Sequence, residues 1–529
     1  MSPFPNPARD LPDRFNAATF FVDRHLREVR GGKVAIECGD ERITYAQLAE
    51  RVNRLGNALR SLGVCPEERV FLLLLDTPEF AYSFFGTIKI GAVAVPVNTL
   101  LKPADYEYLL NDSRARVAVV SQALLPQVQA IPRERLHYLQ HLIVVGEAPA
   151  GTHAFSSLLE AGSPELAPAP THKDDPCFWL YSSGSTGFPK GCVHLQHDMV
   201  VTAELYARGI LGITERDRFF SVAKLFFAYG LGNGLYFSLL VGGTSILLPG
   251  PPTPKSVFDV IERHRPTLFF SVPSNYAALL DYRRTEGGDF DLSSVRYGVS
   301  AGEALPAAIF RRFQERFGVE ILDAVGSTEA LHMFIANRPG GVRPGSSGQI
   351  ISGCDARIVD EEGHPVAPGE IGNLVIRSDA VCACYWNQHE KTKDTIEGHW
   401  LRTGDKYRQD EDGYFWYAGR TDDMLKVSGV WVSPAEIEST LIEHPAVQEA
   451  AVVGRRDKDD LVKPAAWVVL REGIPSTPSL AQEMCDFVAE RLPIYKRPRW
   501  VEFLPALPKT ATGKIQRFKL RQRTVGSDS

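Results

Sequence analysis

The first half of the chain alternates uninterrupted apolar segments with segments of helical period, and this order restricts the fold more than any other feature. Residues 70–75 and 92–97 are continuous apolar runs, as expected of strands buried on both faces. Residues 78–90 begin with proline, which favours the first turn of a helix. Before them, Thr44 and Gln47 have the spacing of a capping box and open a second helical pattern. Strand, helix and strand in this order predict a parallel sheet.

The same order returns beyond residue 198. Helical patterns alternate there with short apolar runs, and the predicted elements lie at residues 199–211, 218–222, 230–240, 244–248, 257–265 and 267–271. We therefore expect an α/β protein in which about the first 340 residues form two doubly wound subdomains.

Shorter alternating stretches with glycine turns follow from about residue 340, for example at residues 355–360, 373–377 and 413–418. They predict a small β-rich, barrel-like subdomain over about residues 341–421. Helical and strand patterns after residue 430 predict a separate, smaller α+β domain. The expected division is an N-terminal domain of residues 1–421 and a C-terminal domain of residues 422–529.

The charge pattern excludes several classes of partner. The formal charge is −6 and the two signs are interspersed, which leaves no broad basic surface for nucleic acid. No uninterrupted apolar run is nearly as long as the about 20 residues that a membrane-spanning helix needs. The N-terminus lacks the apolar segment of a signal peptide. Eight scattered cysteines fit a reducing cytoplasm. We expect a cytoplasmic monomer or homodimer that binds small molecules, without nucleic acid or membrane partners.

Two short pairs have the spacing of metal ligands. They are Cys382-x-Cys384 and His194-x-x-His197, and neither has a second pair at ligand spacing. We interpret both pairs as structural.

Residues 181–191, YSSGSTGFPKG, have the composition of a phosphate-binding loop. Glycines let backbone N–H groups approach an anion, the hydroxyls add donors, and Lys190 adds positive charge. The apolar residues 177–181 place this loop after a buried strand. The loop is not a Walker A motif, because Pro189 stands where that motif has glycine and Gly191 stands where it has serine or threonine.

A second polar turn, residues 326–329 with the sequence GSTE, follows the apolar residues 321–325. Ligands of open α/β sheets bind at such strand ends. A carboxylate facing phosphate is repelled unless a divalent cation bridges the two, so Glu329 is a candidate Mg²⁺ ligand and Thr328 a candidate phosphate donor.

Three further features lie in the last 130 residues. Asp405 ends a predicted strand, where a short acid can bind the two ribose hydroxyls of a nucleotide. A charged run including Arg420 and Asp422 stands at the change of composition between the two domains. Near the end, Lys514 follows a glycine turn and is a candidate electrophilic clamp.

These motifs, in this order and over nearly the whole chain, resemble those of the adenylate-forming superfamily. That superfamily includes acyl- and aryl-CoA synthetases, adenylation domains of peptide synthetases and beetle luciferases. The resemblance implies a phosphate loop, an adenine-side turn, a turn for adenine, α-phosphate and Mg²⁺, a ribose pair, a hinge at Asp422 and an adenylation lysine at Lys514. The implied phosphate loop contains Ser182, Ser183, Gly184, Ser185, Thr186, Gly187 and Lys190. The implied adenine-side turn contains Gly302, Glu303 and Ala304, and the turn for adenine, α-phosphate and Mg²⁺ contains Gly326, Ser327, Thr328 and Glu329. The implied ribose pair is Asp405 and Arg420.

The resemblance also implies two half-reactions that use ATP, Mg²⁺ and coenzyme A. A carboxylate attacks the α-phosphorus of ATP and releases pyrophosphate, and a thiol then displaces AMP from the acyl-adenylate. Between the two steps the mobile C-terminal domain turns about the hinge. This turn withdraws Lys514 and presents another face, with Lys426, Ser428 and Gly429, beside the thiol tunnel.

Two segments that resemble those of benzoate-CoA ligases indicate the acid. The first contains Phe227, Ala228, Tyr229 and Gly230, and the second contains His332 and Met333. Amino-acid-activating domains usually place an Asp in the first segment, and none stands there in this chain. Walls of Phe, Ala and Tyr suit a small aromatic carboxylate such as benzoate, with His332 marking the far or the carboxylate end.

Three other functions stay open on the sequence. A stand-alone aryl adenylation enzyme would share the first step and load a carrier protein. A kinase-like phosphotransferase would form ADP, although the mismatches at Pro189 and Gly191 disfavour it. A luciferase-like oxygenase would consume oxygen on the same fold.

Overall fold

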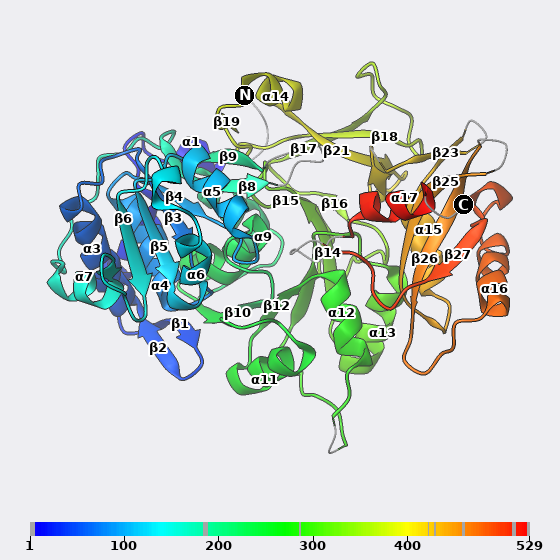
Figure 1. The fold of residues 1–529 in the computed structure, drawn as a ribbon, viewed down its shortest axis with the longest axis horizontal. Helices are drawn as coiled ribbons and strands as arrows, with labels where there is room; N and C mark the ends of the chain where they lie inside the picture. Colours follow the sequence, from blue (N-terminus) through cyan, green and yellow to red (C-terminus); the bar gives the residue numbers. More distant parts are fainter. Residues whose placement is uncertain are drawn as a thin grey trace.

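The structure is a computed structural model that describes residues 6–182, 189–284, 287–421, 423–427, 430–457, 461–509 and 515–525. Two large sheets with helices on their faces form the first two thirds of the chain (Figure 1). A smaller antiparallel sheet follows, and a three-stranded sheet with helices lies at the C-terminal end, coloured orange to red. The mixed α/β class predicted from the sequence is confirmed.

The first large sheet has eight strands in the order β19-β9-β8-β4-β3-β5-β6-β7. Its strands from β8 to β7 in that order run parallel, and β9 and β19 add two antiparallel strands at the edge. Their bounds are β3 Arg69–Leu73, β4 Val93–Pro96, β5 Val117–Ser121, β6 His141–Val145, β7 His153–Ala154, β8 Pro176–Ser182, β9 Lys190–Leu195 and β19 Cys384–Tyr385.

The second large sheet has nine strands in the order β16-β15-β14-β13-β12-β10-β11-β1-β2. Its central strands, from β1 to β14, run parallel, and β2, β15 and β16 are antiparallel at the two edges. Their bounds are β1 Val34–Cys38, β2 Glu41–Thr44, β10 Arg218–Ser221, β11 Thr244–Leu247, β12 Leu268–Ser271, β13 Tyr297–Ser300, β14 Ile321–Gly326, β15 Met333–Ala336 and β16 Gln349–Ile350.

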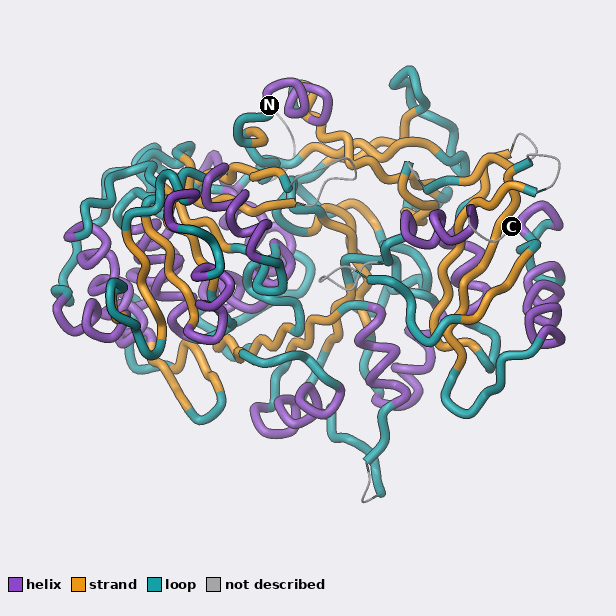
Figure 2. Tube along the Cα trace, in the orientation of Figure 1, coloured by secondary structure: helices purple, strands orange, loops and turns teal. Residues whose placement is uncertain are grey.

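Helices lie between and beside these sheets (Figure 2). Their apolar side chains belong to the buried cores. Helix α3 (Tyr45–Ser61) begins at the predicted capping box, because Thr44 Oγ1 accepts from the Gln47 backbone and the Gln47 side chain accepts from the Thr44 backbone. Helix α4 (Pro78–Lys89) is almost wholly buried against it. The outer helices of the second sheet are α11 (Pro254–His264), α12 (Pro273–Asp281) and α13 (Ala307–Phe317).

The two helices predicted at residues 199–211 and 230–240 are interrupted by wider π turns. The first consists of α8 (Asp198–Thr202) and η4 (Ala203–Arg208). The second consists of α9 (Ala228–Leu231), η5 (Gly232–Tyr236) and α10 (Phe237–Val241). Such π turns insert a residue into a helix and re-aim its side chains, often at a functional site.

Two smaller regions follow the large sheets along the chain. A five-stranded antiparallel sheet contains β17 Asp355–Val359, β18 Gly372–Arg377, β20 Ile396–Glu397, β21 Trp400–Gln409 and β22 Phe415–Arg420. The C-terminal region contains the hairpin β23 Leu425–Val427 and β24 Val430–Val432, the sheet β25 Val447–Arg456, β26 Val462–Leu470 and β27 Trp500–Phe503, and helices α15 Pro434–Ile442, α16 Pro478–Ala489 and α17 Arg517–Val525.

Buried His25 makes the fold sensitive to acid. Its ring is fully buried, with Nε2 2.7 Å from the carbonyl oxygen of Leu239 and Nδ1 3.2 Å from Arg30 Nη1. The arginine can only donate, so Nδ1 accepts and the ring is neutral. Burial lowers the pKa of His25 to about 4. Because this pKa lies below its usual value near 6.5, the stability contributed by the neutral ring is complete above pH 6.5 and is lost as pH falls toward 4.

We expect the free energy of unfolding to fall by up to about 3 kcal/mol more in the wild type than in a His25→Gln variant between pH 7 and pH 4. Glutamine keeps a donor for the Leu239 carbonyl but does not titrate. Urea unfolding at a series of pH values measures the difference. Parallel curves for the two proteins would contradict the assignment.

Candidate functional site

The predicted phosphate loop joins two antiparallel strands of the first sheet. Strand β8 ends at Ser182 and β9 begins at Lys190, and the two residues are paired in register. The ends of the loop are held in place, because Tyr181 donates to Asp112 Oδ2 at 2.7 Å and Tyr108 donates to the Pro189 carbonyl at 3.2 Å. The predicted residues between them lie outside the described residues: Ser183, Gly184, Ser185, Thr186 and Gly187.

Glu329 lies beside this loop, although about 140 residues separate them in the sequence. Its Oε1 accepts from Ser182 Oγ at 3.2 Å and from the Tyr385 hydroxyl at 2.8 Å. Lys190 Nζ stands 4.1 Å from the centre of the Tyr385 ring. Burial, with the Glu329 charge next, raises the pKa of Tyr385, so it stays a neutral donor. The fold therefore brings together the end of the predicted phosphate loop, Lys190 and the predicted metal ligand.

Tyr385 was not predicted from the sequence. It lies on the two-residue strand β19, which pairs with β9, and no motif marks it. The Cys382 backbone N–H also donates to the Glu329 carbonyl at 2.7 Å. This segment thus contacts both the backbone and the side chain of Glu329.

The turn that carries Ser327 and Thr328 is tightly constrained. A Cβ at Gly326 would lie 2.4 Å from the carbonyl oxygen of His332, so a side chain cannot be accommodated without a shift. Ser327 Oγ accepts from the Ala330 N–H at 3.1 Å. Leu331 has a φ of +63°, a left-handed conformation that is unusual for leucine. Such local strain is often found at functional sites.

The predicted adenine-side turn lies beside the GSTE turn. Gly302, Glu303 and Ala304 follow β13, and residues 326–329 end β14 and follow it. Because β13 and β14 are parallel neighbours, their carboxyl ends meet at one edge of the sheet. The fold therefore places both predicted nucleotide turns together.

The predicted ribose pair is present as an ion pair. Asp405 on β21 and Arg420 on β22 are partners in register, and Arg420 Nη1 lies 2.9 Å from Asp405 Oδ1. The arginine side chain is 48% exposed and the aspartate only 16%, so the pair borders solvent.

The predicted acid pocket brings its two segments together at His332. Its Nε2 lies 3.1 Å from Asn233 Oδ1, and its ring centre lies 4.5 Å from that of Phe237. Tyr229 is 5.9 Å away by the same measure, and its hydroxyl lies 3.1 Å from two carbonyl oxygens. Burial lowers the pKa of His332 to about 3, so the ring is neutral at neutral pH. The surroundings of His332 are aromatic and uncharged.

The other residues predicted for the acid pocket belong to the same two segments. Ala228 begins α9 and Met333 begins β15, and both are buried. Phe227 contacts Phe226, with ring centres 4.2 Å apart. A Cβ at Gly230 would lie 2.1 Å from the carbonyl oxygen of Lys224, so only glycine fits there. Asn233 and Phe237 are additional neighbours of His332 that no sequence motif marks.

Several predicted residues lie outside the described residues, namely Asp422, Ser428, Gly429 and Lys514. Lys426 belongs to β23. Next to the predicted hinge, Asp423 Oδ1 accepts from Arg521 Nη1 at 2.7 Å, and Arg517 contacts Glu438 with two bonds from Nη2, at 2.9 and 2.7 Å. Helix α17 is thus tied to the beginning of the C-terminal region.

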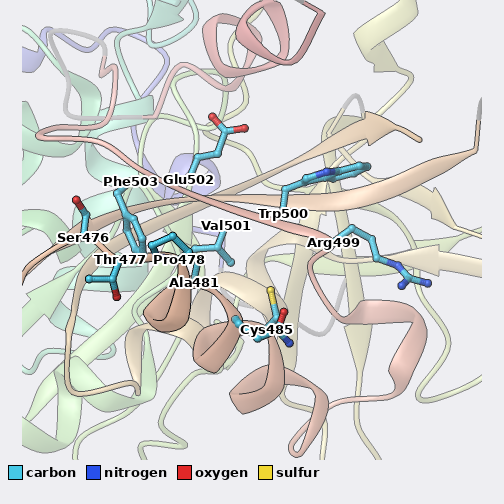
Figure 3. A pocket seen from close by; sticks show the side chains of 11 residues that line it. Ser476, Thr477, Pro478, Ala481, Cys485, Arg499, Trp500, Val501, Glu502 and Phe503 are labelled. Atoms are coloured by element: carbon cyan, nitrogen blue, oxygen red, sulfur yellow. The ribbon is translucent and has the colours of Figure 1, made fainter. Parts of the chain in front are cut away.

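The described residues contain no cluster of three or more His, Cys, Asp or Glu side chains able to hold a metal ion. A groove of about 470 Å³ lies between α16 and β27 (Figure 3). Its lining includes Thr477, Cys485 and Trp500 but none of the predicted site residues. Within the described part of the chain, no helix is long and apolar enough to cross a membrane.

Comparison with known proteins gives two family matches. The model described as AMP-binding enzyme matches residues 22–386, and the model described as AMP-binding enzyme C-terminal domain matches residues 436–514. The Benzoate--CoA ligase of Thauera aromatica is 51% identical over 518 residues, covering 97% of both chains. The 4-hydroxybenzoate--CoA/benzoate--CoA ligase of Rhodopseudomonas palustris is 44% identical, covering 98% of this chain and 95% of that protein.

Solved structures give the same relationship. The anthranilate CoA ligase AuaEII in complex with anthranoyl-AMP superposes with a TM-score of 0.94 at 48% identity, covering 98% of this chain and 99% of that one. A benzoate CoA ligase from Burkholderia xenovorans LB400 superposes with a TM-score of 0.88 at 46% identity, covering 96% and 100%.

Proposed function

The chain belongs to the AMP-binding enzyme family, and on that basis we propose that it joins benzoate, or a close ring-substituted benzoate, to coenzyme A through an enzyme-bound aryl-adenylate. The observation that carries the proposal is the contact of Glu329 with Ser182 at the end of the phosphate loop. It occurs in a chain half identical, over its length, to a benzoate-CoA ligase. Pyrophosphate leaves in the first step and AMP in the second.

In the first step two anions must approach each other. The loop at residues 183–188 binds the β- and γ-phosphates, with Ser182 and Lys190 at its ends. The carboxylate of Glu329 fits a hard divalent cation, because an oxygen ligand beside phosphate is what Mg²⁺ prefers. When bound there, Mg²⁺ neutralises charge on the phosphates. Thr328 donates to the α-phosphate, and Lys514 stabilises the charge that develops as the benzoate oxygen attacks.

The adenosine part of ATP is held at the edge of the second sheet. Adenine lies between the turns that contain Gly302 and Gly326, and the ribose hydroxyls bind Asp405. Arg420 holds Asp405 in position, since the two are joined at 2.9 Å. After adenylation, the C-terminal domain turns about Asp422 and presents Lys426, Ser428 and Gly429 to coenzyme A.

The pocket favours an uncharged aromatic ring. Phe227, Ala228 and Tyr229 form its walls, and a neutral His332 closes it without placing a charge beside the ring. No acidic side chain stands in the 227–230 segment to pair with an ammonium group, so amino acids are disfavoured. All eight cysteines are free thiols, which supports a reducing compartment such as the cytoplasm.

A panel of acids tests this proposal. Pyrophosphate release is measured with benzoate, hydroxybenzoates, aminobenzoates, cinnamate and fatty acids, and mass spectrometry identifies the product. We expect benzoates to be used best and the product to be the coenzyme A thioester. Formation of ADP, or a preference for fatty acids, would refute the proposal. Aryl transfer to a carrier protein in place of coenzyme A would support the stand-alone adenylation enzyme.

An Asp405→Asn variant is expected to raise the KM for ATP by about 10-fold or more while leaving the KM for benzoate unchanged. Loss of a charged acceptor for ribose hydroxyls costs about 1.5–3 kcal/mol. Steady-state kinetics with each substrate varied measures both constants. The matched control is Glu397→Gln, which breaks an exposed ion pair with Arg402 on the same sheet and leaves both constants unchanged. An equal effect of the two changes would refute the ribose role.

A further inference from the structure

His194 lies on β9, the strand that begins at Lys190. Its side chain is fully buried and stacks on Phe178, with ring centres 5.1 Å apart and planes 18° apart. Its Nδ1 lies 2.8 Å from Asp198 Oδ2, and its Nε2 lies 2.9 Å from the carbonyl oxygen of Thr328. A buried histidine thus connects a carboxylate on α8 to the turn that carries Thr328 and Glu329.

His197 makes a similar set of contacts beside it. Its Nδ1 lies 2.9 Å from the Lys173 carbonyl, and its Nε2 lies 3.1 Å from the Asp379 carbonyl. The same Nε2 is 3.1 Å from Asp198 Oδ1. The more exposed Asp174 carboxylate is 3.3 Å from Nδ1. Asp198 is therefore flanked by two histidine rings.

The contacts determine which atom of His194 donates to the turn. A carbonyl oxygen accepts hydrogen bonds and does not donate them, so the Nε2 that faces the Thr328 carbonyl carries hydrogen and donates. Asp198 Oδ2 lies 2.8 Å from the other ring nitrogen and also accepts from the Leu195 N–H at 3.1 Å. His194 therefore gives the Thr328 carbonyl a donor whose direction is fixed by Asp198.

The cluster of His194, His197 and Asp198 contacts two backbone segments that adjoin Glu329. His194 binds the Thr328 carbonyl on one side. On the other, His197 binds the Asp379 carbonyl, and the segment that continues from Asp379 contacts Glu329 through the Cys382 N–H and the Tyr385 hydroxyl. A buried hydrogen bond from a ring that a carboxylate holds in place fixes the backbone of the turn.

Stability alone does not account for this arrangement. Burying a polar pair costs desolvation that well-packed apolar side chains avoid, so a buried His–Asp pair is weak grounds for a stabilising role. The pair gives direction instead, because Asp198 orients the ring so that Nε2 is aimed at one carbonyl. That carbonyl belongs to the residue before the predicted metal ligand.

We propose that His194 and Asp198 are positioning residues for adenylation, which hold the Thr328 carbonyl so that the side chains of Thr328 and Glu329 are aligned with ATP and its metal ion. The proposal rests on the proposed function of the site. His194 touches no substrate and acts through the backbone of the turn. His197 Nε2 lies 3.1 Å from the second oxygen of the same carboxylate.

Two neutral substitutions of similar size separate this role from simple support of α8. In a His194→Gln variant the amide nitrogen lies near the former Nε2 and can still donate to the Thr328 carbonyl. In a His194→Asn variant it lies near the former Nδ1 and can donate to Asp198 but not to Thr328. We expect the Asn variant to lose about 10–100-fold in kcat for benzoate-dependent ATP–pyrophosphate exchange. The Gln variant should stay within about fivefold of wild type.

Other readouts distinguish alignment from misfolding. The KM for benzoate and the rate of thioester formation from supplied benzoyl-adenylate should be unchanged in both variants. The increase in melting temperature produced by MgATP should be smaller in the Asn variant than in the Gln variant. Equal losses in the two variants, a greater loss in the Gln variant, or a loss confined to the benzoate KM would overturn the proposal.

The wild-type protein gives an independent test. Nitrogen-15 NMR of histidine-labelled protein should show a ring whose Nε2 carries a hydrogen protected from exchange with solvent, and this signal should disappear in both variants. A His194 Nε2 without hydrogen would overturn the proposal whatever the variants do. If the wild type exchanges pyrophosphate with no acid, the proposed function fails, while the NMR signal and the MgATP melting shift still report on His194.

Discussion

A Lys514→Ala variant is expected to lose adenylation by about 100-fold or more while still converting supplied benzoyl-adenylate and coenzyme A to the thioester. In the first step the lysine faces charge that develops between benzoate and the α-phosphate, and removal of one such group typically costs this much. In the second step the domain has turned and the lysine is withdrawn. ATP–pyrophosphate exchange measures the first half-reaction, and thioester formation from benzoyl-adenylate measures the second.

The matched control is Lys519→Ala, which removes an exposed lysine of α17 and should leave both half-reactions unchanged. The ends of the Lys514 segment are held on the C-terminal region, because Lys509 forms a β-bridge with Ile515 and a 2.7 Å ion pair with Glu449. The variant should therefore fold normally, which its melting temperature checks. Equal loss of both half-reactions in a folded Lys514→Ala protein would contradict the division of roles.

A Glu329→Gln variant is expected to lower the rate of adenylation by about 100-fold or more, because the amide lacks the negative charge that holds Mg²⁺ beside the phosphates. The substitution keeps the size of the side chain and an oxygen that can accept from Ser182 and Tyr385. The loss should therefore come from the charge and not from packing. Pyrophosphate exchange over a Mg²⁺ titration measures it, with the half-saturating Mg²⁺ concentration raised in the variant.

Tyr385→Phe is the comparison for this prediction. It removes one hydrogen bond to Glu329 Oε1 but keeps the carboxylate, so we expect a loss of about 10-fold or less, in line with about 1 kcal/mol for a single bond. If Glu329→Gln were no worse than Tyr385→Phe, or if its Mg²⁺ dependence were that of wild type, Glu329 would not be the metal ligand.

Local sequence signals predicted individual elements well. The capping box at Thr44 and Gln47 forms as predicted, and the helix ends at Ser61, two residues before Gly63, whose φ is +78°. Pro78 marks the first turn of α4 as expected. Each of these signals involves only a few neighbouring residues, so the sequence near each position is enough to predict where the helix begins or ends.

Pairings between distant segments could not be read from periodicity. Strands β1 and β2 belong to the second sheet, where β1 pairs with β11, although they precede every strand of the first sheet in the sequence. Strand β19 joins the first sheet at β9 from within the region of the small antiparallel sheet. An apolar period shows that a segment is buried, and it does not identify its partner.

The residues of the candidate site also divide into those that a local motif predicts and those that it does not. Glu329 was predicted from its turn, but Tyr385 and Asn233 were not, because each contributes one side chain from a segment without a motif. His194 was interpreted as structural from its spacing with His197. The structure connects His194 to the carbonyl oxygen of Thr328. That contact joins residues 134 positions apart, a distance no local pattern reports.

The pairing of β1 with β11 also affects how the protein can be made. During synthesis, residues 34–38 leave the ribosome about 200 residues before residues 245–247, their partners in the register of the sheet. Until then this apolar strand has only β2 beside it and offers an unpaired edge to other chains. Domains usually fold as units while the chain emerges, but β1 cannot pair with β11 until residue 247 has been made, and the sheet is complete only after β16 at residues 349–350. Nascent chains stalled before residue 244 should therefore depend on chaperones more than chains stalled after residue 350.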